Sequence, residues 1–421
     1  MAKQRAHRQK KASRTSRFHR FSKKQILVFG LLFATVGIIG LVTSFAASYP
    51  YDDAGQAKLP TDPTRGLVYD GLRKIKATAF WHPCHGGFEV KNVRAGNRPS
   101  CTHGPDPAPV GVDMTQPVDG LTTALANEQD ATVFTQDQIP AMQKQAQEIV
   151  AAATTGLAPN SLPRTIPKCY GDGSDARRVQ LLLVNTNVRD AATLSHMKSS
   201  LAITSERVET QVVMSSTTAG ITSPNSVTRH IRYVQGTNCI PIVSQINMRA
   251  RPGYDFTYAD ITAFLQVNGY NHSDRKYLIW FDGRTKICGA GSAYNDSSKE
   301  STNQANSYVG YAVVGPACWN RAGVELHELS HTLGAVQLDA PHTSGGYHCL
   351  DEQDVMCYAD GVNGKTVNRK SVYVDPKCTK ASLDLFLDCN DSDYFNASTT
   401  ISTGSYIYQH WNTANSGFLG L

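Results

Sequence analysis

The chain has 421 residues, of which 41% are hydrophobic and 18% are charged, and this length and composition suit two or three globular domains. They exclude a disordered chain, a collagen-like fibre and a small disulfide-stapled peptide. The first 25 residues hold ten Lys and Arg and no acid, which leaves 31 basic and 35 acidic side chains for the rest of the chain. We therefore expect a basic cytoplasmic tail at residues 1–25 and no nucleic-acid partner for the folded part.

An uncharged segment follows this tail at residues 26–47 and is rich in Leu, Ile, Val and Phe. About 20 such residues are enough to cross a bilayer as a helix, and the basic flank predicts that the N-terminus stays in the cytoplasm. The sequence therefore predicts a single-pass protein of the cell membrane, with one N-terminal transmembrane helix and an extracellular main domain. The alternative is a secreted protein, since residues 44–47 could form a signal-peptide cleavage site.

All ten cysteines lie beyond the apolar segment. An even number of cysteines in an exported chain is typical of a disulfide framework, whereas free thiols would be expected only in a reducing compartment. The sequence does not fix the pairing, but short loops are the easiest to close. On that ground we expect bridges between Cys84 and Cys101, between Cys349 and Cys357, and between Cys378 and Cys389.

The expected elements divide into two regions. Residues 48–165 are rich in Gly, Pro, Asp and Asn, which predicts loops with one amphipathic helix at 135–154. Residues 166–421 alternate strands with helices, which argues for layers of helices on a sheet, before cysteines and aromatic residues take over in the C-terminal part. The expected strands are 179–184, 230–234, 240–246, 276–281 and 308–314, and the expected helices are 190–213 and 258–267.

One stretch carries metal chemistry. Residues 323–334 read Gly-Val-Glu-Leu-His-Glu-Leu-Ser-His-Thr-Leu-Gly. On a helix, His327 and His331 are four residues apart and point from one face, where two imidazoles can hold one zinc ion. Glu328, beside the first histidine, is placed to take a proton from a metal-activated water. By itself, this five-residue motif also occurs by chance on exposed helices without a metal.

The continuation of the motif argues against chance. Gly334 follows His331 by three residues and can end the helix sharply, and Met356 lies further on. Together these residues resemble the metzincin clan of zinc metallopeptidases, in which HExxHxxG and a third ligand are followed by a methionine-containing turn. The resemblance covers residues 324–358. It implies a zincin-like catalytic domain at residues 166–421, of the α+β class, with a mixed sheet and an active-site helix.

The position at which the clan carries its third ligand holds Gln337 in this chain. Gln337 itself, His342 and His348 could each supply the ligand, although a glutamine amide is a poor zinc ligand. We favour His348 because it precedes Met356 by eight residues, the interval found in the matrixin branch of the clan. Tyr358 stands where astacin-like and serralysin-like members carry a tyrosine that contacts the metal or the oxyanion, and its alternative role is packing.

The resemblance implies a zinc-dependent endopeptidase that hydrolyses peptide bonds of a protein or peptide substrate. In this interpretation Zn²⁺ is held by His327, His331 and His348, and the catalytic residues are Glu328 and Tyr358. Two alternatives stay open. One is a non-catalytic surface module for binding or adhesion, which the departure at the third ligand favours. The other is a zinc hydrolase that acts on a cell-wall amide or another nonpeptide bond.

A second group of histidines and cysteines lies at residues 82–103. Its spacing fits no standard zinc pattern, so a disulfide with incidental histidines is the favoured interpretation. Residues 101–106 also resemble, faintly, a cysteine switch, in which a propeptide thiolate occupies the open position of the zinc. The even number of cysteines argues against the free thiol that such a switch requires.

Overall fold

The computed structural model describes residues 59 and 61–421, apart from 110, 117, 126–131, 153–161, 218–224, 351–353 and 358–384. The described residues group into one compact unit. Within the described residues, no helix is long and apolar enough to cross a membrane, and the segment 26–47 lies outside them. The prediction of a single-pass membrane protein with an extracellular main domain is therefore corrected, because no helix among the described residues could span a membrane.

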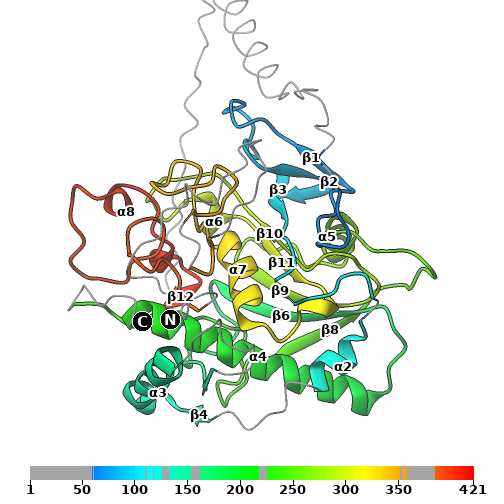
Figure 1. The fold of residues 1–421 in the computed structure, drawn as a ribbon, viewed down its shortest axis with the longest axis horizontal. Coiled ribbons are helices and arrows are strands. Elements are labelled where there is room, and N and C mark those ends of the chain that lie inside the picture. The colour runs from blue at the N-terminus through cyan, green and yellow to red at the C-terminus, as the bar shows by residue number, and fades with distance from the viewer. Residues whose placement is uncertain are drawn as a thin grey trace, which may run out of the picture. The chain divides into compact units, whose positions relative to one another are not determined.

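Eight strands of the described chain form one mixed sheet, in the order β1-β2-β3-β10-β11-β9-β6-β8 (Figure 1). Strands β11, β9, β6 and β8 pair in parallel, and β10, β3, β2 and β1 continue the sheet in antiparallel pairs. Their bounds are Leu72–Lys74 (β1), Phe88–Ala95 (β2), Arg98–Pro105 (β3), Arg178–Asn185 (β6), Val243–Asn247 (β8), Arg275–Asp282 (β9), Gly289–Ser292 (β10) and Gly310–Val314 (β11).

Long helices alternate with these strands along the chain, because a parallel pair needs a long crossover connection. Helix α4 (Ala191–Thr217) follows β6, α5 (Tyr258–Val267) follows β8, and α7 (Ala322–Thr332) follows β11. The chain is therefore a mixed α/β structure with a large mixed sheet, and the predicted α+β class is wrong. The α+β class was an implication of the resemblance. The alternation of strands and helices in the sequence instead favoured layers of helices on a sheet, which is the arrangement found.

The parallel strands are buried on both faces, as their continuous apolar stretches indicate. On β6, Val179, Leu181 and Leu183 pack in the core that includes α4 and α7, and all three are fully buried. The alternate residues Leu182 and Val184 pack in the core that includes α5. Helix α7 consequently lies against one face of the sheet, where it contacts β10 and β11 (Figure 1).

Helix α7 ends in a tight cap. The amide of Gly334 donates to the carbonyl of His331 (3.1 Å) and the amide of Ala335 donates to that of Ser330 (3.0 Å), which is the bond pair of a Schellman motif. Gly334 has a φ of +87°, and a Cβ there would lie 2.7 Å from the indole nitrogen of Trp411. The predicted sharp end of the motif helix is thus confirmed, and only glycine fits it without strain.

Most of the other predicted elements are confirmed. The helix expected at 135–154 is α3, and the strands expected at 179–184, 276–281 and 308–314 are β6, β9 and β11. Strands β1 to β3 come from the loop-rich region, so both predicted regions contribute to one sheet. The remaining elements are α2 (Gly120–Leu125), β4 (Val133–Phe134), α3 (Ile139–Ala152), β5 (Arg164–Thr165), β7 (His230–Ile231), α6 (Gln304–Ser307), α8 (Tyr406–Gln409) and β12 (Leu419–Gly420), with short 3₁₀ turns between them.

Four disulfides join described cysteines: Cys84–Cys101, Cys169–Cys239, Cys288–Cys318 and Cys349–Cys357. The predicted bridges Cys84–Cys101 and Cys349–Cys357 are therefore confirmed, whereas Cys378 of the third predicted bridge lies outside the described residues. The other two bridges span 70 and 30 residues. Loop length could not identify them, because the fold brings those distant segments together.

Strand β9 carries a buried lysine that should make stability depend on pH. Lys276 is fully buried, its Nζ donates to the carbonyl of Tyr308 (2.7 Å), and burial lowers its pKa from 10.5 to about 7. Between these values the unfolded chain binds more protons than the folded one, so the free energy of unfolding should rise with pH, by up to about 1.4 kcal/mol per unit from this group.

Lys276→Met should remove that contribution. Denaturant unfolding at several pH values between about 7 and 10 should therefore give a flatter pH dependence for the variant than for the parent. The exposed Lys144 supplies the control, and Lys144→Met should keep the parent slope. An unchanged slope in Lys276→Met would contradict the prediction.

Candidate metal centre

Three histidines converge beside α7. The helix holds His327 and His331 one turn apart, and their Nε2 atoms lie 3.0 Å from each other. The loop after the helix brings His348, whose Nε2 atom lies 3.2 Å from that of His331. All three side chains are buried. The structure thus brings together the three histidines that the sequence nominated, although His348 follows the second by 17 residues.

The methionine turn, residues 354–357, orients the first of these histidines. The carbonyl oxygen of Val355 lies 2.6 Å from Nδ1 of His327. That nitrogen therefore carries the proton and donates it, which leaves the lone pair of Nε2 directed at the other rings. Met356 is fully buried beside this contact, where it packs in the core that includes α7.

The same turn also tethers the loop that carries His348. The amide of Cys349 donates to the carbonyl of Met356 (3.1 Å), and the Cys349–Cys357 disulfide joins the residue after His348 to the end of the turn. The carbonyl of His348 in turn accepts the amide of Ser344 (2.7 Å). Backbone bonds on one side and a disulfide on the other thus fix the position of this imidazole.

The other sequence candidates lie elsewhere. Nδ1 of His342 lies 2.8 Å from a carboxylate oxygen of Asp393. The side-chain nitrogen of Gln337 donates to the carbonyl of Gly334 (2.9 Å), and its side-chain oxygen accepts the backbone amide of Asp296 (2.7 Å). Tyr358 lies outside the described residues. Of the three candidates for the third ligand, the structure therefore joins only His348 to the other two histidines.

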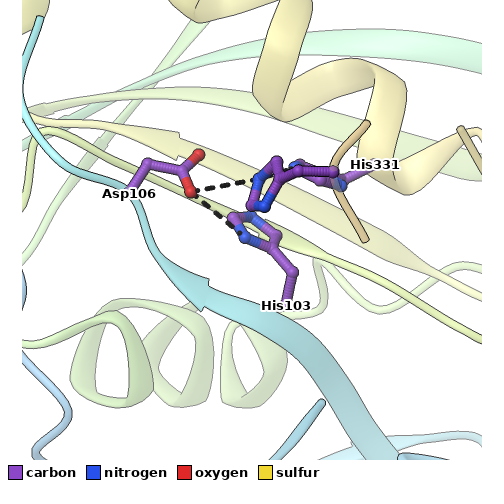
Figure 2. A group of neighbouring side chains, drawn as sticks. His103, Asp106 and His331 are labelled. Carbon is purple, nitrogen blue, oxygen red and sulfur yellow. Dashed lines mark hydrogen bonds and ion pairs between the residues drawn. The ribbon is translucent and has the colours of Figure 1, made fainter. Parts of the chain in front are cut away.

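Strand β3 and the residue that follows it bring two further side chains to the cluster, and the sequence analysis proposed neither as a ligand. The ring of His103 stacks on that of His331, with the centroids 3.6 Å apart. The carboxylate of Asp106 lies 2.8 Å from Nε2 of His327, 3.3 Å from Nε2 of His348 and 3.4 Å from Nδ1 of His103. Figure 2 shows this carboxylate directed at the imidazoles, with His103 on the strand and His331 on the helix.

A signal for these two residues was present in the sequence. His103 and Asp106 lie three residues apart, directly after Cys101, in the group that we attributed to a disulfide. That disulfide exists between Cys84 and Cys101, so the cysteine-switch hypothesis is wrong, because Cys101 has no free thiol. The same segment nevertheless reaches the histidines, and it does so with a carboxylate.

Glu328 lies within the same cluster and is fully buried. Its Oε2 atom lies 3.2 Å from Nε2 of His103, whereas its Oε1 atom has no hydrogen-bond partner in the described part of the chain. Two glycines of β10 leave room for it. A Cβ at Gly289 would lie 1.9 Å from Oε1 of Glu328, and one at Gly291 would lie 2.8 Å from its carbonyl oxygen.

Burial sets the protonation of these groups. It raises the pKa of Glu328 well above its ordinary value, and the nearby Asp106 carboxylate adds to the effect. It lowers the pKa of His103 to about 4 and that of His331 well below its ordinary value. Burial opposes the ionisation of Asp106 as well, but three facing histidines hold the pKa of its carboxyl well below the ordinary value. Neutral imidazoles and an ionised carboxylate are the forms that bind a divalent cation.

These buried groups could hold a metal ion. Suitable ligand atoms of His103, Asp106, His331 and His348 all lie within 4.8 Å of one another, as do those of Asp106, His327 and Glu328. Ligand atoms bound to one tetrahedral zinc ion lie about 3.3 Å apart, close to the Nε2 separations of 3.0 Å between His327 and His331 and 3.2 Å between His331 and His348. The donor set of imidazoles and one carboxylate therefore fits a divalent cation in both chemistry and spacing.

A second group with suitable ligand distances consists of Cys349, Asp354 and Cys357. Its two cysteines form a disulfide and offer no thiolate to a metal. The Asp354 carboxylate instead accepts the amides of Met356 (2.7 Å) and Cys389 (3.2 Å). This group therefore shapes the methionine turn, and the histidine cluster is the candidate metal site.

No family model matches the chain, and no curated protein is similar to it at a significant level. The assignment of a function therefore depends on the geometry of the histidine cluster and on the resemblance carried by its motif.

Proposed function

We propose that the chain is a zinc-dependent peptidase of the metzincin type, in which His327, His331 and His348 hold the metal and Glu328 is the general base. One observation carries the proposal: three buried histidine Nε2 atoms meet beside a buried glutamate of the same helix. The substrate class, a protein or a peptide, follows from the resemblance of the motif.

A bound zinc ion would polarise a substrate carbonyl and lower the pKa of a water molecule toward about 7. Glu328 supplies the proton acceptor that this chemistry needs, since its Oε1 atom has no hydrogen-bond partner among the described residues. The same residue can then return the proton to the leaving amine.

The test measures metal content and hydrolysis together. The full chain should contain about one zinc ion per molecule, and cleavage of a casein-type substrate should stop with phenanthroline and return with added zinc. Because Asp106 lies within the cluster, the parent and the Asp106→Ala variant are both assayed. Chelator-sensitive cleavage by either protein supports the proposal. It is overturned if both bind zinc and both leave the substrate intact.

A non-catalytic binding module is a second candidate, and Asp106 is the observation that favours it. Three histidines and this carboxylate would make four protein ligands, and a closed set of four is typical of structural zinc sites. A module of this kind would bind zinc and would stay inactive after Asp106→Ala. Hydrolysis by that variant therefore separates the two candidates.

Gly289→Ala should slow hydrolysis without removing the metal. The added Cβ would lie 1.9 Å from Oε1 of Glu328, so the base must move, and such displacements lower kcat by about 10- to 100-fold. Gly404→Ala is the control, because a Cβ at that position meets no atom within 4 Å. Zinc analysis and kcat are compared for both variants, and a Gly289→Ala enzyme with the parent kcat would contradict the expected position of Glu328.

A further inference from the structure

One peptide unit of the methionine turn joins a buried carboxylate to the candidate metal centre. The carbonyl oxygen of this unit, from Val355, lies 2.6 Å from Nδ1 of His327. The N–H of the same unit, from Met356, donates to Oδ1 of Asp354 (2.7 Å). Because a trans peptide directs its C=O and N–H groups in opposite directions, the imidazole and the carboxylate lie at the two ends of one peptide dipole.

The surroundings of Asp354 suit a charged side chain. Asp354 is only 3% exposed, and both of its carboxylate oxygens accept hydrogen bonds. Oδ1 accepts the hydroxyl of Tyr394 as well as the amide of Met356, and Oδ2 accepts the amide of Cys389 (3.2 Å). An asparagine at this position would turn its own N–H groups toward one of these donors. The contacts therefore favour a carboxylate over a neutral side chain of the same shape.

A segment of the C-terminal part fixes the turn. The carbonyl of Phe386 accepts the amide of Val355 (3.0 Å). The hydroxyl of Tyr394, which donates to Asp354, also accepts a backbone amide (2.8 Å), and the ring of Tyr394 is buried. The peptide unit is thus held on both sides, and its carbonyl keeps one direction.

The two histidines of α7 differ in what faces their second nitrogen. Nδ1 of His327 faces the Val355 carbonyl, whereas Nδ1 of His331 has no hydrogen-bond partner in the described part of the chain. An acceptor at the second nitrogen orients a ligand ring and raises its basicity. A carboxylate at the far end of the same peptide strengthens that acceptor, because hydrogen bonds in a chain polarise one another.

We propose that Asp354 is a positioning residue for the metal, whose negative charge acts through the peptide unit of the methionine turn on His327 and strengthens zinc binding by this histidine. The inference rests on the metal site of the proposed function and makes no use of the hydrolytic step. A plain Asx turn would also give the contact between Asp354 and Met356, but the charge of the side chain would then have no effect on the metal.

The test compares neutral substitutions of Asp354 in the full chain. Asp354→Asn keeps the size of the side chain, and Asp354→Ser keeps an oxygen that can accept the amide of Met356 in the same kind of turn. Both remove the charge. We expect the zinc dissociation constant, measured by competition with a chromophoric chelator, to rise about 10- to 100-fold in both variants, as is typical when the partner behind a metal ligand is lost.

Two control variants keep the charge of Asp354. Asp393→Asn removes another buried carboxylate, which pairs with His342 (2.8 Å), and Tyr394→Phe removes the hydroxyl that holds Asp354. Both should keep the zinc affinity of the parent, even where they lower the free energy of unfolding. Parent affinity in the two Asp354 variants, or an equal loss of affinity in Tyr394→Phe, would overturn the proposal.

Proton signals of the cobalt-loaded chain test the same contact in the parent, where folding is not in question. The Nδ1–H of His327 should exchange with water more slowly than that of His331, since only the first has an acceptor among the described residues. Asp354→Ser should speed the exchange of the His327 proton alone. Equal exchange of both protons in a parent that binds cobalt would overturn the role of Asp354 and no other assignment. A parent that binds neither zinc nor cobalt would overturn the metal centre as well.

Discussion

Replacing Glu328 by glutamine is expected to lower hydrolysis by about 10²- to 10⁴-fold, the contribution of a positioned general base, while zinc content stays at the parent level. The amide matches the carboxylate in size and fits the same buried space beside Gly289, but it cannot accept the proton. We expect the loss in kcat/KM both in the parent and in the Asp106→Ala background.

Glu325 supplies a matched control for this substitution. It lies on the same helix and is also fully buried, but its Oε1 atom accepts the indole N–H of Trp280 and the amide of Asn320, both at 3.1 Å. Burial raises the pKa of Glu325 to about 8, so glutamine resembles its protonated form near neutral pH. Glu325→Gln should keep the parent rate. Equal losses in the two variants, or no loss in Glu328→Gln, would refute the assigned role of Glu328.

The local part of the site could be predicted from the sequence because helical geometry is short-range. His327 and His331 are one turn apart on any regular helix, and Gly334 marks the helix end through a φ that glycine alone adopts easily. His348 required the further argument from its spacing to Met356. Its place in the structure depends on a small loop closed by the Cys349–Cys357 disulfide, whose pairing was predictable because the two cysteines are close in sequence.

The contribution of β3 could not be predicted, because it depends on pairing between strands that are distant in sequence. His103 and Glu328 are 225 residues apart, and they meet only after β3 pairs with β10. Nothing in the local pattern of residues 98–105 identifies that partner. The membrane-anchor prediction had a different weakness: it came from the length of an uncharged apolar segment and from its basic flank, and that segment lies outside the described residues.

Removing the imidazole of His348 is expected to weaken metal binding far more than removing that of His342. The total binding free energy of a structural zinc site is about 10–16 kcal/mol, so each of four ligands contributes about 2.5–4 kcal/mol. That corresponds to a dissociation constant raised about 100-fold or more in His348→Ala. His342 pairs with Asp393 instead, so His342→Ala should keep the zinc affinity of the parent.

Competition with a chromophoric zinc chelator gives both affinities on one scale, and Gln337→Ala completes the comparison of the three sequence candidates. The side chain of Gln337 bonds the backbone groups of Gly334 and Asp296, so its removal should also leave the affinity near that of the parent. A large loss in His342→Ala or Gln337→Ala, with His348→Ala unaffected, would mean that the metal draws its third ligand from a different part of the loop. The peptidase geometry proposed for α7 and the methionine turn would then be wrong.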